Sequence, residues 1–384
     1  MCKKNVIFVQ LKQLVMLDEN FYRLALRYQQ KIGNGLVKKL IRMFGSAQAV
    51  FDQNAHQYAI KQGWNRSVPF PKITREVEKC VAIDLKQIER GEVKICHFTD
   101  AEYPQRLLYC RDSPPTLFYK GNPIFNSRKS LAVVGTRNAT SYGTDVVRKI
   151  LTDFQGDDLT VISGMALGID TIAHEAALQN NLPTIAVWGS GLGVVYPPLN
   201  LHLSEKIIES GGALVSEFSF KTQPDRQNFP ARNRIVAGMS DAVLVAETGV
   251  KGGSIITAEI ASSYNRDVFA VPGSVFASAQ EGCNELIRKN IAALVTSGTD
   301  IIEMMGWNLS ERKYIQPQLF VEFSENEKMI LTLFAEKQEL SVDEIVAKMA
   351  ECCKPSKVSS LLLGLELNGV IECRPGKLYR IIQK

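Results

Sequence analysis

Two arginines, Arg232 and Arg234, stand one residue apart in this chain, behind Phe229 and Pro230 and directly before an apolar run. A guanidinium group is permanently charged and binds phosphate through two parallel hydrogen bonds. An aromatic ring beside such a pair can stack on an unpaired base. The segment therefore indicates either a site for a polyanion or a surface turn that caps a helix.

Three glycine-containing loops add places where the phosphates of a ligand could approach the backbone. Each loop follows an apolar run and precedes a segment of helical spacing, where amides and the helix dipole favour an anion. The loops begin Gly135-Thr136-Arg137, Ser163-Gly164-Met165 and Lys251-Gly252-Gly253-Ser254. None follows the order of a P-loop or of a dinucleotide fingerprint. We expect a ligand with many phosphates, although each loop is also consistent with a tight turn.

Asp170 and His174 lie four residues apart in the segment after the second loop, so a helix would place them on one face. Such a pair can transfer protons. The sequence shows no nucleophile or third partner for it. A role in shaping the loop is therefore favoured over catalysis.

The composition is that of a soluble globular protein, with 384 residues, 45% hydrophobic and 22% charged. This length predicts two or three domains. No stretch approaches the roughly 20 apolar residues that span a membrane, and the first apolar run is too short for a signal peptide. Eight cysteines form no C-x-x-C pair and the four histidines are scattered. We expect a cytoplasmic protein without a metal site or cofactor.

The net charge of +5 is unevenly distributed along the chain. Residues 1–96 hold 17 Lys and Arg against 8 Asp and Glu, whereas residues 97–316 hold 19 against 22. Residues 317–384 hold 9 against 10. The basic first quarter is consistent with contact to a polyanion or with an ordinary solvated lysine face.

Residues 24–51 have the spacing of a helix, a short loop and a second helix. The loop Gly33-Asn34-Gly35 precedes Lys38, Lys39 and Arg42, an arrangement that resembles a helix-hairpin-helix element holding a phosphate. Asn34 replaces the usual apolar residue between the glycines. The element is therefore either a phosphate site or a packing module.

From Ser130 to Trp307, short apolar runs alternate with glycine loops and helical segments. Unbroken apolar runs are typical of strands buried on both faces of a parallel sheet. We predict an α/β fold with a Rossmann-like, doubly wound, mostly parallel sheet, whose ligand binds beyond the carboxyl ends of the strands. The predicted strands are Leu131–Val134, Thr160–Ile162, Thr184–Trp188, Ala213–Val215, Ala242–Ala246 and Val268–Val271.

After a polar linker, the last part of the chain predicts three helices and a two-stranded ribbon, the pattern of a winged helix. Its net charge is negative and its third helix carries only Lys354 and Lys357. Counterion release would then contribute little affinity for DNA. A role in protein contact or regulation is favoured over duplex binding.

Many motifs of this chain occur in the same order in one known protein family. The matching motifs are Tyr103-Pro104, Pro114-Pro115-Thr116-Leu117-Phe118-Tyr119-Lys120-Gly121, Val134-Gly135-Thr136-Arg137, Ser163-Gly164 with Ala166, Gly168-Ile169-Asp170 and Ala173-His174, Tyr196-Pro197, Ser216-Glu217, Phe229-Pro230 with Arg232-Asn233-Arg234, Gly253-Ser254 with Thr257-Ala258, Val271-Pro272-Gly273, and Gly282-Cys283-Asn284 with Leu286-Ile287. Over roughly residues 100–305, the chain resembles the DNA-processing protein A family (DprA, or Smf). The flanks agree with its helical N-terminal domain, of the helix-hairpin-helix or SAM-like type, and its C-terminal winged helix.

The resemblance implies a protein without enzymatic activity that binds single-stranded DNA as a homodimer. It would protect incoming DNA and load the RecA recombinase during natural transformation. The dimer, and near it the RecA contact, would form at the C-terminal half of the Rossmann-like domain. The implied DNA-binding residues are Gly135, Thr136, Arg137, Ser163, Gly164, Arg226, Phe229, Arg232, Asn233, Arg234, Lys251, Gly253 and Ser254. The expected domains are residues 1–96, 97–307 and 319–384, with a linker over 308–318.

Three departures from the family pattern concern individual loops. Gly193 stands where the family often has Asp, and Gly252 replaces a serine. Arg288-Lys289-Asn290-Ile291-Ala292 replaces a frequent glycine-alanine step near the expected dimer surface.

The alternative function is that of an enzyme on nucleoside monophosphates, similar to the Rossmann-like phosphoribohydrolases. Such an enzyme needs an unobstructed acidic general base, for which Glu259 or Glu217 is the candidate. A purely structural partner protein is a third alternative.

Overall fold

The computed structural model describes residues 19–307, 323–334, 339–350, 352–367, 370–374 and 378–381. The chain divides into two compact units, Met1–Asn308 and Leu309–Lys384, each of which is described by itself. The linker expected over 308–318 lies outside the described residues.

The first unit is built on a nine-stranded sheet. Its strands are β1 (Lys94–His97), β2 (Thr116–Gly121), β3 (Lys129–Gly135), β4 (Leu159–Ser163), β5 (Thr184–Trp188), β6 (Ala213–Ser216), β7 (Ala242–Glu247), β8 (Asp267–Ala270) and β9 (Ala293–Leu294). The spatial order is β1-β2-β6-β5-β4-β3-β7-β8-β9. All neighbours from β6 to β9 are parallel, whereas β1 and β2 pair antiparallel. The prediction of an α/β fold with a mostly parallel sheet is confirmed.

The order of the strands reverses between β3 and β7. After β3 the chain adds β4, β5 and β6 on one side, and it then returns to add β7, β8 and β9 on the other. This is a doubly wound sheet, and the point of reversal is where such sheets open a crevice for a ligand.

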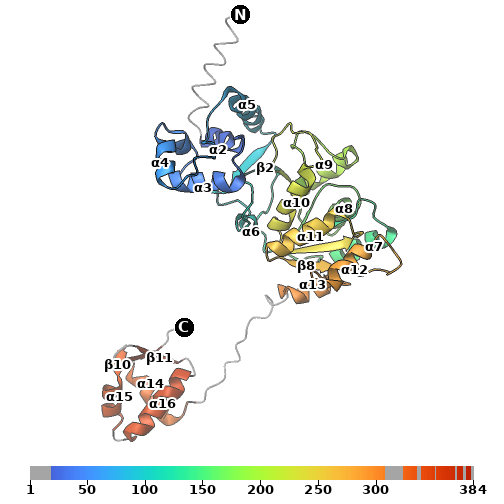
Figure 1. The fold of residues 1–384 in the computed structure, drawn as a ribbon. Coiled ribbons are helices and arrows are strands. Elements are labelled where there is room, and N and C mark those ends of the chain that lie inside the picture. Colours follow the sequence, from blue (N-terminus) through green and yellow to red (C-terminus); the bar gives the residue numbers. More distant parts are fainter. Residues whose placement is uncertain are drawn as a thin grey trace, which may run out of the picture. The chain divides into compact units, whose positions relative to one another are not determined.

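Helices cover both faces of the sheet (Figure 1). They are α7 (Ser141–Thr152), α8 (Ile169–Gln179), α9 (Leu201–Glu209), α10 (Asn228–Met239), α11 (Gly253–Ser263), α12 (Glu281–Arg288) and α13 (Gly298–Met304). Alternate residues of β3 point to opposite faces. Leu131 and Val133 pack with α7, α8 and α13, whereas Ala132 and Val134 pack with α10, α11 and α12. Burial on both faces explains why the strand sequences are continuously apolar.

A helical segment precedes the sheet and packs against its β2 side (Figure 1). It contains α2 (Glu19–Arg27), α3 (Asn34–Phe44), η1 (Gln48–Phe51), α4 (Ala55–Lys61) and α5 (Arg75–Glu89). Phe21 and Leu24 of α2 share a buried cluster with Phe118 of β2. The boundary expected after residue 96 falls inside β1, so this segment and the sheet are joined within one compact unit.

The glycine loop of this helical segment contacts protein. The Asn34 side chain donates to the carbonyl of Asp112 at 3.3 Å. Lys38 is 5% exposed, and its ammonium donates to the Ser113 hydroxyl at 2.7 Å and to the Arg111 carbonyl at 3.1 Å. Burial lowers the pKa of Lys38. Of the two interpretations that the sequence left open, these contacts favour the packing module.

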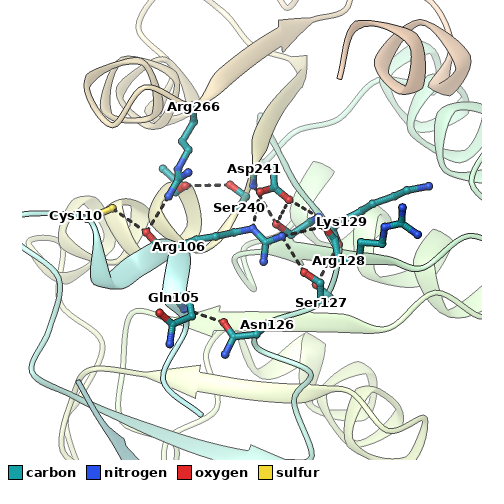
Figure 2. A network of polar contacts seen from close by, with 12 residues as sticks. Gln105, Arg106, Cys110, Asn126, Ser127, Arg128, Lys129, Ser240, Asp241 and Arg266 are labelled. Carbon is teal, nitrogen blue, oxygen red and sulfur yellow. Dashed lines mark hydrogen bonds and ion pairs between the residues drawn. The ribbon is translucent and has the colours of Figure 1, made fainter. Parts of the chain in front are cut away.

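A polar network fixes the amino ends of the central strands (Figure 2). Arg106, in α6 (Gln105–Leu108), points towards Asp241 and donates to its carboxylate at 2.5 Å. The other carboxylate oxygen of Asp241 accepts from the amide and the hydroxyl of Ser130, each at 2.9 Å. Arg266, in the turn between α11 and β8, donates to the Arg106 carbonyl at 2.8 Å. The starts of β3 and β7 are thereby held together.

The second unit contains three helices and a small antiparallel sheet. They are α14 (Glu325–Leu333), α15 (Val342–Lys348), α16 (Pro355–Leu367), β10 (Glu339–Ser341), β11 (Ile371–Arg374) and β12 (Leu378–Ile381). The sheet order is β10-β12-β11. The sequence predicted the three helices and the ribbon of β11 and β12, but it did not predict β10, which is too short for an alternating pattern.

Candidate functional site

A groove of about 590 Å³ lies beyond the carboxyl ends of β3, β4 and β7, at the point where the strand order reverses. Tyr196 and four segments line it, the segments being residues 134–137, 164–170, 226–236 and 252–257. A smaller cavity of about 60 Å³, which we call the side pocket, shares five residues with the groove: Arg137, Ala166, Tyr196, Phe229 and Arg232. Segments far apart in the sequence therefore meet at one edge of the sheet, as the strand pattern predicted.

Most of the site residues expected from the sequence line this groove. They are Gly135, Thr136, Arg137, Gly164, Arg226, Phe229, Arg232, Asn233, Gly253 and Ser254. Ser163, Arg234 and Lys251 do not line it. Ser163 is buried and its hydroxyl donates to the Val133 carbonyl at 2.6 Å, whereas Lys251 is exposed in the loop before α11.

Arg137 and Arg226 supply charge to the groove. Both residues are exposed. Within the described part of the chain, neither forms a salt bridge. The Arg137 guanidinium lies over the ring of Phe229, 5.3 Å from its centroid. Both guanidinium groups are free to bind an anionic ligand.

Arg232 lines the groove, but internal partners hold its charge. It is 6% exposed, and it donates to the Val187 carbonyl at 2.5 Å and to the Asn233 side chain at 3.1 Å. Its guanidinium lies 3.8 Å from the carboxylate of Asp170. Burial lowers the pKa of Arg232 and raises that of Asp170, while each charge opposes the shift of the other. Arg232 therefore shapes the floor of the groove.

Gly164 allows this floor to form. A Cβ atom at position 164 would lie 2.1 Å from the Arg232 guanidinium and 2.2 Å from the Asp170 carboxylate. Any larger residue would separate the ion pair. The glycine of the second loop is thus required by close packing.

Arg234 points into the protein, away from the groove. Its guanidinium contacts the Glu217 carboxylate at 2.5 Å and lies 4.0 Å from that of Asp112. The side chains of Arg234 and Glu217 are 13% and 12% exposed. Burial raises the pKa of Glu217, and Arg234 opposes this shift. Arg234 therefore links α10 to Glu217, directly after β6, and to Asp112, in the loop before β2.

The separation of Arg232 from Arg234 follows from the start of α10. The sequence placed both arginines before a helix, but α10 already begins at Asn228. Pro230 is tolerated there because the first turn of a helix needs no amide donor at that position. Residues two apart on a helix point to opposite sides. One arginine therefore faces the groove and the other the interior.

The amino end of α11 forms a further wall of the groove. The helix begins at Gly253 with Gly252 as its N-cap, and no side chain caps it. Gly252, Gly253 and Ser254 all line the groove. Amides in the first turn of a helix lack internal acceptors and attract anions.

Asp170 and His174 support the loop between β4 and α8. Asp170 accepts from the Ala166 amide at 3.3 Å. His174 is fully buried, with its ring nitrogens 2.6 Å from the Gly164 carbonyl and 2.7 Å from the Thr184 hydroxyl. Since His174 does not line the groove, its contacts favour the scaffolding role over acid–base catalysis.

His174 makes the fold sensitive to acid. Burial lowers its pKa from 6.5 to about 4. The unfolded chain takes up the proton below about pH 6.5, whereas the folded chain resists it, so stability falls as the pH drops from about 6.5 towards 4. We expect His174→Gln to reduce this loss by about 2 kcal/mol between about pH 6.5 and 5, measured by urea unfolding. If the parent and the variant lose the same stability over this pH range, His174 is not the cause of the acid sensitivity.

The carboxylates proposed for the alternative enzyme lie outside the groove. Glu259 is exposed on α11 and Glu217 is paired with Arg234, and neither is a lining residue. Asp170 does line the groove, but it is buried against Arg232. Among the residues that line the groove there is no unobstructed acidic general base, so the geometry does not favour the phosphoribohydrolase-like function.

The apolar residues of the side pocket were not predicted from the sequence. These are Met165, Leu167, Tyr196 and Pro197, which line the pocket together with Phe229. Tyr196-Pro197 was noted only as a family motif. A pocket that combines residues from three separate loops and from α10 has no local signature in the sequence.

The described residues contain neither a membrane-spanning helix nor a metal-binding cluster of side chains. No helix there is long and apolar enough to cross a membrane. In the same residues, no group of three His, Cys, Asp or Glu side chains is arranged to hold a metal ion.

A comparison with protein families identifies the chain. The model of the family described as DNA recombination-mediator protein A matches residues 94–306. The chain belongs to this family. The match covers all nine strands and every segment that lines the groove.

Individual members of the family show how far the similarity extends. The DNA processing protein DprA of Streptococcus pneumoniae is 42% identical over 228 residues, which are 59% of this chain and 80% of that protein. A solved structure of DprA from Streptococcus pneumoniae superposes with a TM-score of 0.55, at 35% identity over 71% of this chain and 98% of that one. The DprA structure from Helicobacter pylori, described as showing a single-stranded DNA binding mode, gives a TM-score of 0.51 at 27% identity over 56% and 97% of the two chains.

Proposed function

We propose that this member of the recombination-mediator family binds single-stranded DNA along the groove, without catalysing a reaction. The observation that carries the proposal is the meeting of Arg137, Arg226 and the amino end of α11 in one cavity beyond the central strands. Two guanidinium groups with no carboxylate partner among the described residues, beside the first turn of a helix, are suited to successive phosphates of a strand. The Helicobacter pylori relative, described as binding single-stranded DNA, supports this choice of ligand.

The assignment of DNA-contacting residues follows their placement. We propose that Arg137, Arg226, Gly253 and Ser254 contact phosphates, with Gly135, Thr136 and Asn233 as neighbouring walls. Gly164 and Arg232 shape the floor, and Lys251 extends the positive charge beyond the groove. Ser163 and Arg234 would affect DNA binding only indirectly, because their side chains make internal contacts that stabilise the fold.

We further propose that the protein protects incoming DNA and loads the RecA recombinase onto it in the cytoplasm during natural transformation, as the family resemblance implies. The C-terminal half of the sheet would form the homodimer. Support comes from β9, which is an edge strand of the sheet in the described part of the chain and on which Leu294 is 46% exposed. An open apolar edge favours pairing with another chain. The RecA contact would lie near the same end.

The loop beside β9 is consistent with the family pattern despite its different residues. Asn290 has a φ angle of 54°, in the left-handed region. Glycine adopts this region without strain, and Asn tolerates it better than most residues. Asn290 can therefore take the place of the family's frequent glycine.

For the flanking segments we propose the same types as the family. Helices α2 to α5 would form the helix-hairpin-helix or SAM-like domain, used for packing. The C-terminal unit would be a winged helix that contacts protein or regulates binding. The exposed lysines Lys354 and Lys357 are few for a duplex-binding surface.

Direct binding measurements test the proposed function. We expect a labelled single strand to bind more tightly than a duplex of the same length, measured by fluorescence anisotropy between about 0.05 and 0.3 M salt. The logarithm of the affinity should fall linearly with that of the salt concentration, by about 0.7 for each phosphate neutralised. Absence of binding to either form, or an equal affinity for both, would contradict the proposal.

A further inference from the structure

A group of exposed apolar side chains lies at the carboxyl edge of the sheet, outside both cavities. It consists of Tyr142 at the start of α7, Val250 in the loop after β7, and Val275 and Phe276 in the loop after β8. We call this group the apolar rim. None of its members lines the groove or the side pocket. Phe276 is 95% exposed and Val275 is 81% exposed. Single exposed apolar residues are common, whereas a group of them marks a contact surface.

Hydrogen bonds hold the segments of the apolar rim beside one another. The Tyr142 hydroxyl donates to the Pro272 carbonyl at 2.5 Å, which ties the start of α7 to the loop after β8. The amide of Gly282, directly after the same loop, donates to the Thr248 carbonyl at 2.9 Å. Thr248 belongs to the loop that carries Val250. The three segments therefore form one surface.

The loop that carries Phe276 is anchored at several points. The Phe276 amide donates to the Ser274 hydroxyl at 3.2 Å, and the Ser274 amide donates to the side-chain oxygen of Gln280 at 2.9 Å. The Gln280 side chain in turn donates to the buried carboxylate of Glu247 at 3.3 Å. An anchored loop therefore presents the Phe276 ring to the solvent.

Glu247 also links the apolar rim to the groove. It lies at the end of β7, and its carboxylate accepts from the hydroxyl of Thr140 at 2.6 Å and from the Thr140 amide at 2.8 Å. Thr140 belongs to the loop that carries Arg137, a lining residue of the groove. In the loop after β7, Lys251 directly precedes Gly252, which also lines the groove. The apolar rim and the groove are therefore connected through two loops.

We propose that the apolar rim stacks on unpaired bases of a single strand whose phosphates lie in the groove. This inference rests on the proposed function and extends the DNA contact beyond the groove. Phe276 would stack on a base where the strand passes the amino end of α11, and Tyr142 would contact a neighbouring base. Aromatic rings beside a positive groove are the stacking platforms of proteins that bind single strands without sequence preference. A duplex hides the faces of its bases and cannot make this contact.

The charges beside the apolar rim indicate a contact that depends little on salt. Lys251 precedes α11 and Glu281 begins α12, and both side chains are exposed. Since their charges are opposite, they add little net attraction for a phosphate. The contact would therefore be made by stacking. Loss of the Phe276 ring should lower the affinity without changing the slope of the salt dependence, because that slope counts neutralised phosphates.

Phe276→Ser tests the inference with a labelled oligothymidine and an abasic strand of the same length, which keeps the phosphates and lacks the bases. In fluorescence anisotropy, the variant should bind the oligothymidine about tenfold more weakly than the parent does, with the same salt slope. It should bind the abasic strand as the parent does. Phe276→Trp should restore the affinity, and the oligothymidine should quench the fluorescence of the new ring whereas the abasic strand should not.

Tyr109→Ser is the matched control. Tyr109 is 83% exposed directly after α6, whose Arg106 contacts Asp241 at the amino ends of the central strands, so it lies at the opposite edge of the sheet. This variant should bind both strands as the parent does.

Three results would overturn the inference or its basis. If Phe276→Ser binds the oligothymidine as the parent does, or loses the same factor on the abasic strand, the stacking contact is wrong and the phosphate groove stands. If Phe276→Ser changes the oligomeric state in light scattering, the apolar rim is a contact between copies of this chain, and the inference is wrong. If the parent binds neither strand, the proposed function fails as well.

Discussion

Replacement of Arg137 and Arg226 by glutamine in one variant is expected to weaken binding of single-stranded DNA by at least about 100-fold. Both guanidinium groups line the groove, and neither has a carboxylate partner in the described part of the chain. Each removed hydrogen bond to a charged group costs about 1.5 to 3 kcal/mol. The slope of the salt dependence should also fall by about 1.4, because two phosphates are no longer neutralised. Anisotropy titrations across salt concentrations measure both quantities.

A control variant that loses the same charge outside the groove distinguishes direct contacts with DNA from the effect of the protein's net charge. Arg148 and Lys149 are exposed on α7 and are not lining residues of the groove. Their joint replacement by glutamine should leave the affinity within about twofold at moderate salt, because exposed charges at a distance are screened. Equal losses in the two double variants would show that DNA binds elsewhere or without a fixed site.

Arg234→Ala is expected to lower the free energy of unfolding by about 3 to 5 kcal/mol. The substitution leaves the Glu217 carboxylate, whose side chain is 12% exposed, without its partner. Removal of one member of a buried pair is costly because the other charge remains buried. Urea unfolding followed by circular dichroism measures the loss. The fraction that remains folded should bind DNA with the affinity of the parent.

The double variant Arg234→Leu with Glu217→Leu identifies the cause of this loss. Replacing both charges by apolar groups removes the desolvation cost, so most of the stability should return. Arg288→Ala, which removes an exposed pair with Glu285, should change the stability by less than about 1 kcal/mol. A stable Arg234→Ala protein with weak DNA binding would instead make Arg234 a direct DNA contact.

The sheet and the place of the site could be predicted from the sequence for a physical reason. A strand buried on both faces is continuously apolar, and glycine loops after such strands mark its carboxyl end. The predicted strand Thr184–Trp188 coincides with β5, and the loops at Gly135, Gly164 and Gly253 meet in one groove. Parallel strands bring their ends to one edge whatever lies between them in the sequence.

The direction of individual side chains could not be predicted in the same way. Whether Arg232 and Arg234 share a face depends on the first residue of α10, which is Asn228, so both arginines lie within the helix and not in a turn that caps it. Lys38 stood in a motif typical of phosphate binding, yet its partners are carbonyl and hydroxyl groups about 70 residues later in the chain. Partners so distant in sequence leave no local pattern.

The neutralisation of Arg232 by Asp170 and of Arg234 by Glu217 has a kinetic consequence. Of the four arginines that were predicted for the site, Arg137 and Arg226 have no carboxylate partner in the described part of the chain, and under the proposed function they would set how long a strand remains bound. Differences in affinity between related complexes arise mainly from dissociation rates. With two ionic contacts in the groove of each molecule, the residence time would be short, and firm retention would require several molecules on one strand. Under the proposed function, each molecule could then leave the strand without displacing its neighbours.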